Sequence, residues 1–286
     1  MNTQFWVIQA FNGISYGALL FLVGSGLSLI FGVMRIVNLA HGSYFLLGGY
    51  IAISVVAATG SWALSLPVAA LAVAIIGLVM ERIFLRPLGF DPLRQVLLTV
   101  GFAFLFQQAA LDIWGGNNMD INPDPIFNNS IIIGGIYFPL YRVFMIAMAL
   151  AIGILLWLVM EKTRIGATVR ATVDDAQMAR GVGIDTNRIS MFIFALGAFL
   201  AALGGVIGGA FLGIYPGLDF EMLPLAFAVV IIGGMGSLGG AAIGALAVGL
   251  ADNFGKALLP EVSYFTLYAP MVLILAIKPT GLFGRE

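Results

Sequence analysis

Four stretches of 30 or more residues contain no charged side chain. They cover residues 1–34, 36–80, 189–218 and 222–251, and aliphatic and aromatic residues dominate each of them. A helix that crosses a membrane needs about 20 consecutive apolar residues. A surface helix of a soluble domain, in contrast, places polar residues on the side that faces water. The four stretches therefore predict membrane-spanning helices.

The composition supports an integral membrane protein in contact with the lipid bilayer. Hydrophobic residues make up 61% of the 286 residues and charged residues only 9%, compared with about 25% charged residues in an average soluble domain. So few polar side chains cannot cover the apolar surface of a soluble chain. The residues before the first apolar run carry no positive charge, and that run is longer than a signal peptide. We therefore expect the first segment to remain as a span.

The apolar runs predict an all-α bundle of about eight or nine spans. We interpret residues 1–286 as a single transmembrane domain with Gly-rich interrupted segments. The predicted spans are 5–34, a second run that ends at Thr59, 62–80, 95–114, 141–160, 189–214, one or two within 222–251, and 264–277.

The distribution of Lys and Arg predicts which loops face the cytoplasm. The loops 81–94 and 161–188 contain three and five of these residues, whereas 115–138 and 215–221 contain none. Short cytoplasmic loops of membrane proteins collect Lys and Arg. The first two loops are therefore predicted inside and the other two outside. Lys278 and Arg285 place the C-terminus in the cytoplasm, and the span count then places the N-terminus outside.

Two Gly-rich interruptions break the apolar pattern, at residues 30–43 and 231–240. Transporters built from repeats carry interrupted helices at corresponding positions, close to their substrate. Two ordinary glycine turns at the membrane surface have the same spacing, so both interpretations stay open. Small residues four positions apart, such as Gly13 and Gly17, predict helices whose backbones approach closely.

Residues 161–188 form the only long polar segment and hold nine of the 27 charged side chains. Within this segment, 167–180 is predicted to be a short amphipathic helix with Val169, Val173 and Ala176 on one side. Gly181 and Gly183 are expected to end it. The segment is either a solvated loop or a coupling helix on which a partner protein acts.

A few polar side chains lie within or beside the spans. Asn38, His41 and Ser43 follow the first interruption, and Gln108 and Asp112 share one face of the fourth span. Polar groups in spans usually line a cavity or a path. We therefore take Asn38, His41, Ser43 and Gln108 as candidates for a substrate path. The alternatives are a polar turn for the first group and the outer surface for Gln108.

The sequence contains no pattern typical of an enzyme. Cysteine is absent, and His41 is the only histidine, which excludes disulfides and sites with several histidine ligands. No Gly-x-x-x-x-Gly-Lys-Ser/Thr phosphate-binding loop occurs, and a net charge of -1 provides no basic surface for nucleic acid. We expect no catalytic residue, metal or cofactor. Few charges are available for an ion relay, so an energy-coupled transporter made from this chain would need an external motor.

Three segments resemble one transporter family. The run from Gly26 to Gly42, GLSLIFGVMRIVNLAHG, is similar to the N-terminal signature of LivH-type permeases, the membrane subunits of branched-chain amino acid ABC importers. Residues 166–184 resemble the cytoplasmic loop of this family that acts like the EAA loop of ABC importers. Residues 225–244, with GGMGSLGG, resemble the Gly-rich segment shared with ribose-type sugar permeases. The similarity covers nearly the whole chain.

The resemblance implies a multi-pass permease of a bacterial inner membrane. Its implied partners are a second, related permease subunit, two cytoplasmic ABC ATPase subunits and a periplasmic substrate-binding protein. The implied substrates are branched-chain or other hydrophobic amino acids, with urea or short amides as the alternative within the family. A carrier or channel that works without ATP is the alternative outside it. The residues expected to couple to the ATPase are Arg170, Asp174, Asp175, Ala176, Arg180, Gly181 and Gly183.

Overall fold

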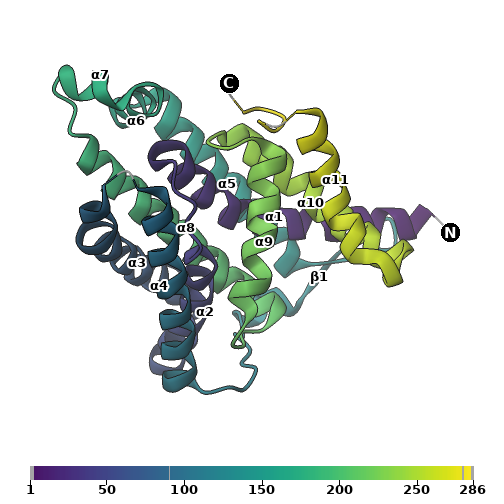
Figure 1. Ribbon diagram of the computed structural model, residues 1–286. Helices are drawn as coiled ribbons and strands as arrows, with labels where there is room; N and C mark the ends of the chain where they lie inside the picture. The colour runs from purple at the N-terminus through teal and green to yellow at the C-terminus, as the bar shows by residue number, and fades with distance from the viewer. Residues whose placement is uncertain (1–2, 90, 279, 285–286) are drawn as a thin grey trace.

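In a computed structural model, residues 3–89, 91–278 and 280–284 are described, and they form a helical bundle (Figure 1). A π-helical turn, Met80–Leu85, and a short 3-10 turn, Arg86–Leu88, extend the third helix. The α-helices are α1 (Thr3–Met34), α2 (His41–Thr59), α3 (Trp62–Val79), α4 (Pro92–Trp114), α5 (Leu140–Lys162), α6 (Arg164–Asp174), α7 (Ala176–Gly181), α8 (Thr186–Leu212), α9 (Leu218–Gly233), α10 (Leu238–Leu258) and α11 (Ser263–Ile277).

The helices follow the predicted apolar runs. Within the described part of the chain, seven are long and apolar enough to cross a membrane: α1, α2, the extended α3, α4, α5, α8 and α10. Helices α9 and α11 have 16 and 15 residues, fewer than the roughly 20 that a crossing needs. The prediction of a polytopic helical bundle is confirmed. The predicted number of eight to nine spans is approximate.

Two local elements differ from the sequence-based prediction. Strands β1 (Ser130–Ile133) and β2 (Ile136–Pro139) form a small antiparallel hairpin in the loop after α4, where no strand was predicted. The prediction of one continuous helix over 167–180 is wrong, because the helix is interrupted between α6 and α7. Asp175 adopts an extended conformation there, and its carboxylate Oδ1 accepts hydrogen bonds from the amides of Gln177 (2.8 Å) and Met178 (2.9 Å). A side chain that caps a new helix competes with continuation of the old one.

Helix α1 lies at the centre of the bundle and packs chiefly against α10 and α8. Glycines make this contact close. A Cβ atom on Gly17 would lie 2.8 Å from Ala245 O, and one on Gly26 would lie 2.6 Å from the carbonyl oxygen of Gly197. Side chains at these positions would push the backbones apart. The close packing predicted from glycine spacing is present.

The loops group by charge as predicted. Arg86, from the loop after α3, donates to the carbonyl of Asn187 at the start of α8 (3.3 Å), so the two Lys/Arg-bearing loops lie together. At the opposite end, Met119 of the loop 115–138 forms a β-bridge with Ile214, which directly precedes the loop 215–221. Figure 1 shows α6 and α7 at one end of the molecule and the end of α4 at the other. Arg285, used above to place the C-terminus, lies outside the described residues.

The two Gly-rich interruptions touch each other. A Cβ on Gly32 would lie 2.8 Å from the Cα of Gly236, and Ser28 Oγ donates to the carbonyl of Ser237 over a long 3.4 Å. Segments about two hundred residues apart thus meet backbone to backbone. This contact fixes the ends of α1 and α9 relative to each other.

Candidate functional site

The chain between α1 and α2 turns back into the bundle. Helix α1 ends before Arg35, which has a left-handed backbone (φ 55°), and residues 35–38 have no regular structure. The amide of Leu39 donates to Thr99 Oγ1 (3.2 Å), and Thr99 is buried within α4. Asn38 Oδ1 accepts from the amide of Ala40 (3.1 Å). Helix α2 therefore begins inside the bundle and not at its surface.

The first turn of α2 lies against the middle of α1. His41 is fully buried, and its Nε2 lies 3.0 Å from the carbonyl oxygen of Val23. A carbonyl oxygen only accepts hydrogen bonds, so Nε2 carries the proton and donates. Its other ring nitrogen, Nδ1, has no partner within the described chain. The histidine thus fixes the start of α2 at mid-length of α1.

A buried carboxylate completes this cluster. Asp219, in the first turn of α9, is 2% exposed, and its Oδ2 accepts from Ser43 Oγ at 3.0 Å. Its Oδ1 has no hydrogen-bond partner among the described residues. The carbonyl of Asp219 also contacts the backbone of Gly42, where a Cβ would not fit. The amides of the first turn of a helix favour a negative charge, which makes this an acceptable position for a carboxylate.

We define the central polar cluster as Asn38, His41, Ser43, Thr99 and Asp219. Its members come from the α1–α2 connection, α2, α4 and α9, and each side chain is nearly or fully buried. Buried polar side chains are costly unless paired, and those in membrane segments usually serve a path. Three of the four candidates for the substrate path thus lie buried around the start of α2.

The sequence interpretation missed Asp219, because residues 215–221 were taken as an outside loop. The structure starts α9 at Leu218, inside that segment. One signal was available: the apolar run 222–232 is too short for a span, so its helix had to begin earlier. The sequence alone does not reveal the contact with Ser43, which is 176 positions away.

Gln108 lies apart from the cluster. Its side chain is exposed on α4, and its Nε2 donates to Asp112 Oδ1 (2.9 Å) one helical turn later. Gln108 therefore faces away from the helical bundle of this chain and not into it.

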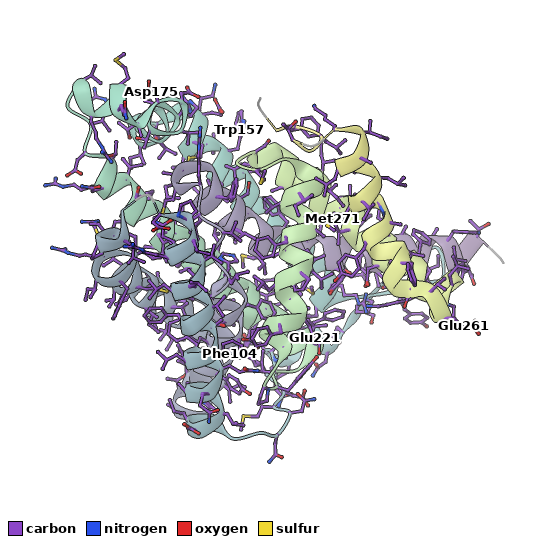
Figure 2. The ribbon with its side chains drawn as sticks, in the orientation of Figure 1. Phe104, Trp157, Asp175, Glu221, Glu261 and Met271 are labelled. Carbon is purple, nitrogen blue, oxygen red and sulfur yellow. The ribbon has the colours of Figure 1, made fainter. Side chains whose placement is uncertain are left out.

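The polar segment 161–188 forms a projection at one end of the bundle, where Figure 2 labels Asp175. Most charged residues proposed there for coupling serve to hold it together. Arg170 bonds to the carbonyl of Met160, and Arg180 Nε donates to Thr186 Oγ1 (2.6 Å). Asp175 caps α7 as described above. Asp174 and Ala176 flank the break between α6 and α7, and Gly181 ends α7.

Two apolar side chains near the tip of this projection are strongly exposed. Met178 and Val182 are 67% and 72% exposed. Gly183, which follows them, has a left-handed backbone (φ 89°) that glycine adopts most readily. The projection therefore presents Met178 and Val182 on a framework held by caps and side-chain hydrogen bonds.

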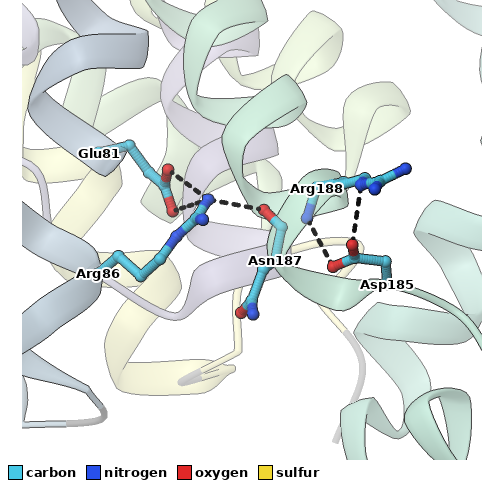
Figure 3. A network of polar contacts seen from close by, with 5 residues as sticks. All are labelled: Glu81, Arg86, Asp185, Asn187 and Arg188. Carbon is cyan, nitrogen blue, oxygen red and sulfur yellow. Dashed lines mark hydrogen bonds and ion pairs between the residues drawn. The ribbon is translucent and has the colours of Figure 1, made fainter. Parts of the chain in front are cut away.

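A polar network fastens the base of the projection to α3 (Figure 3). Glu81, 2% exposed, forms a salt bridge with Arg86 (3.1 Å), and Arg86 also reaches the carbonyl of Asn187. Arg188, next to it, pairs with Asp185 at the start of α8 (2.9 Å). We call Glu81, Arg86 and Asn187 the α3–α8 latch. Movement of the projection at its α8 end must move or break this latch.

Together, the long apolar helices and the buried polar cluster are those of a multi-pass membrane protein of the transport class. A family model described as the permease component of the branched-chain amino acid transport system matches residues 9–275. The chain belongs to this family.

Individual relatives agree with this assignment. The chain is 29% identical to the high-affinity branched-chain amino acid transport system permease protein LivH of Salmonella typhimurium, over 100% of this chain and 98% of that protein. It is 28% identical to the corresponding permease BraD of Pseudomonas aeruginosa, over 97% and 95% of the two chains. The ribose import permease RbsC of Haemophilus influenzae is 30% identical over 46% of this chain and 42% of its own length. These relatives are permeases and not enzymes. No solved structure matches the chain.

Proposed function

We propose that the chain is the permease subunit of an ATP-driven importer in a bacterial inner membrane. It moves branched-chain or other hydrophobic amino acids into the cell. ATP is bound by two cytoplasmic ABC ATPase subunits, a second permease subunit completes the membrane part, and a periplasmic binding protein delivers the substrate. Family membership and the printed functions of the relatives support this proposal.

The exposed pair Met178 and Val182 is the observation that carries the coupling step. Exposure of lone apolar side chains on a charged, water-facing projection costs free energy, and their burial in a complementary pocket is favourable. The ATPase subunit supplies that pocket, and closure of the ATPase pair on ATP displaces α7. Because packed helices switch between discrete arrangements, this displacement passes to α8 and the latch. In this proposal the Lys and Arg side chains of the segment mainly hold it together, and their positive charge keeps it on the cytoplasmic side.

The central polar cluster is the proposed substrate path. Asn38, His41 and Ser43 are joined there by Asp219, and α2 and α9 both begin at this level. A path that opens between α2 and α9 exposes the unpaired carboxylate oxygen and the amides of two helix starts. Such groups bind the ammonium and carboxylate ends of an amino acid.

A double variant, Met178→Asp with Val182→Asp, tests the coupling. Both residues are exposed, so the membrane part stays folded, while the loss of two buried contacts lowers ATPase association at least tenfold, about 1.4 kcal/mol or more. The measurement is the amount of ATPase subunits that co-purifies with the permease. Ile132→Asp, at an exposed position of the hairpin, is the control. Unchanged co-purification in the double variant contradicts the proposed contact.

Two transport assays separate the alternatives. Uptake of labelled leucine and labelled urea by membranes that contain the whole complex distinguishes amino acids from short amides. Flux into liposomes that contain this chain alone, without ATP, would indicate an independent carrier or channel.

A further inference from the structure

Helices α1, α5 and α10 enclose a groove with a volume of about 530 Å³. Aliphatic, aromatic, alanine and glycine residues line it. Among these described residues, the indole nitrogen of Trp157 is the only polar side-chain atom. Such a lining excludes a free amino acid, because the ammonium and carboxylate groups would find no partner there. The groove is therefore separate from the central polar cluster and suits an apolar occupant.

The length of the groove matches one leaflet of a bilayer. Along α5 its lining extends from Ile146 to Trp157, which is roughly 16 Å at 1.5 Å per residue. The hydrocarbon core of a bilayer is about 30 Å thick, so one leaflet is about 15 Å deep. Trp157 lies near the end of α5, which is Lys162. The groove thus runs from one membrane surface to the middle of the span.

The Trp157 end of the groove lies on the side predicted to be cytoplasmic. Figure 2 shows Trp157 at the same end of the molecule as Asp175, which belongs to the projection that carries Lys and Arg. Trp157 is 53% exposed, and tryptophan is enriched at the level of the lipid headgroups. The groove therefore opens at the headgroups of the cytoplasmic leaflet.

Two cations lie just beyond this end of the groove. Lys162 Nζ is 5.6 Å from the centre of the Trp157 ring, and Arg164 begins α6 two positions later. Both are exposed, and neither forms a salt bridge with another described residue. The neighbouring carboxylate of Glu161 pairs with Arg170 instead, at 3.7 Å. Positive charge at this corner is thus available to an anion.

We propose that the groove holds an acyl chain of an anionic phospholipid from the cytoplasmic leaflet, with its phosphate beside Lys162 and Arg164. The apolar lining accepts the chain, and the two cations complement the headgroup. Lys and Arg near the cytoplasmic membrane surface attract anionic lipids. This inference does not depend on amino acid import.

The proposed lipid occupies a position next to the projection. Its acyl chain contacts α1, α5 and α10 together, and α5 continues through Thr163 into α6. The headgroup therefore lies where the bundle joins the segment 161–188. An anionic lipid at this point fills the space between three helices that otherwise lack contact along the groove.

Removal of the two cations tests the headgroup contact. The chain is purified from its membrane with its associated subunits in mild detergent, and phosphatidylglycerol or phosphatidylcholine is added. Native mass spectrometry counts the lipids that stay bound. We expect wild type to prefer phosphatidylglycerol by about tenfold or more, and Lys162→Gln with Arg164→Gln to lose this preference.

Arg94→Gln with Arg188→Gln is the matched control for charge. It removes two cations from the same end of the bundle, 71% and 82% exposed, and we expect the preference to persist. Equal retention of the two lipids by wild type overturns the inference. An unchanged preference after loss of Lys162 and Arg164 does so as well.

Ala242→Phe tests the acyl-chain site. Ala242 lines the groove and is exposed, so the added ring takes the space of the chain without displacing a packed side chain. We expect bound phosphatidylglycerol to fall about tenfold. Ala151→Phe, exposed on α5 but outside the lining, is the matched control and retains the lipid. Thermal unfolding of both variants checks the fold, and undiminished binding in Ala242→Phe contradicts the inference.

Cross-linking of the wild-type chain provides a measurement that needs no variant. Phosphatidylglycerol with a photoreactive diazirine in its acyl chain is added to the purified complex, and adducts are located by mass spectrometry. We expect them on peptides that contain Phe21, Leu150 and Leu246, which line the groove. If a second copy of the chain or another protein covers the groove, these peptides carry no lipid adduct, and the inference fails.

Discussion

At the residue scale, the central feature is the hydrogen bond between Ser43 and Asp219. Both side chains are buried, and one carboxylate oxygen of Asp219 remains unpaired among the described residues. A structural serine usually bonds within its own helix. Ser65, for example, donates to the carbonyl of Trp62 three residues earlier (2.6 Å). Ser43 instead bonds to the first turn of another helix, so it links the two segments that begin within the bundle.

Ser43→Ala tests whether this link takes part in transport. Removing the hydroxyl leaves Asp219 Oδ2 without its partner and costs about 1–3 kcal/mol of stability. If the cluster is the path, uptake per folded complex also falls, while the ATPase subunits remain associated. Asp219→Asn keeps an oxygen that accepts from Ser43 and removes the charge, so it lowers uptake with a smaller loss of stability. The measurements are thermal unfolding of the purified complex and uptake of labelled leucine.

Ser65→Ala is the matched control, because Ser65 is equally buried but bonds only within α3. A purely structural role for the cluster predicts that Ser43→Ala and Ser65→Ala differ in stability but not in uptake per folded complex.

Residue patterns predicted part of this site and missed its carboxylate. Asn38, His41 and Ser43 stood out because polar groups are rare in such a chain. Asp219 was hidden because a carboxylate near Tyr215, Pro216 and Gly217 has the composition of a surface turn. Its burial depends on Gly42, where a missing Cβ lets the start of α9 approach. A contact between segments so far apart in the sequence leaves no periodic signal.

At the element scale, the break between α6 and α7 shows where periodicity fails. Val169, Val173 and Ala176 continue one helical face across Asp175, so the sequence pattern predicts one helix. The carboxylate of Asp175 instead accepts hydrogen bonds from two backbone amides and caps the start of a new helix. As a result α7 can move as a short unit, held at its far end by Arg180 and Thr186.

The α3–α8 latch restrains that unit at its base. Arg86→Met removes the partner of the buried Glu81 carboxylate and the bond to Asn187, so we expect the complex to lose about 2 kcal/mol of stability. We also expect the 161–188 segment to be cleaved faster by protease. Thermal unfolding and the rate of limited proteolysis measure these effects.

Arg188→Met is the control for the latch. Its side chain is 82% exposed in the pair with Asp185, and exposed ion pairs contribute about 0–1 kcal/mol. Equal cleavage rates in the two variants would show that the latch does not restrain the projection.

At the scale of the whole molecule, charge and apolar length predicted the architecture well. The runs without charge correspond to helices, and the loops rich in Lys and Arg lie together at one end. The exact number of spans was not predictable, because α9 and α11 are short and α2 starts within the bundle. Their depth depends on contacts with neighbouring helices, which hydropathy does not encode.

Cysteine labelling tests which end faces the cytoplasm. We expect Val182→Cys to react with a membrane-impermeant maleimide only in inverted vesicles, and Ile126→Cys only in spheroplasts. Both positions are exposed, at 72% and 62%, and the chain has no other thiol. The reverse pattern would show that the positive-inside assignment is wrong and that α7 cannot meet a cytoplasmic ATPase.

The central position of α1 has a consequence for the biosynthesis of the chain. Helix α1 is made before its main packing partners, α8 and α10, whose residues leave the ribosome much later. Its glycine faces therefore remain uncovered in the bilayer during most of translation. The packing around α1 is complete only when α8 and α10 have docked against it. A chain that terminates before Leu238 leaves α1 without α10, and apolar and glycine surface that is normally buried stays exposed.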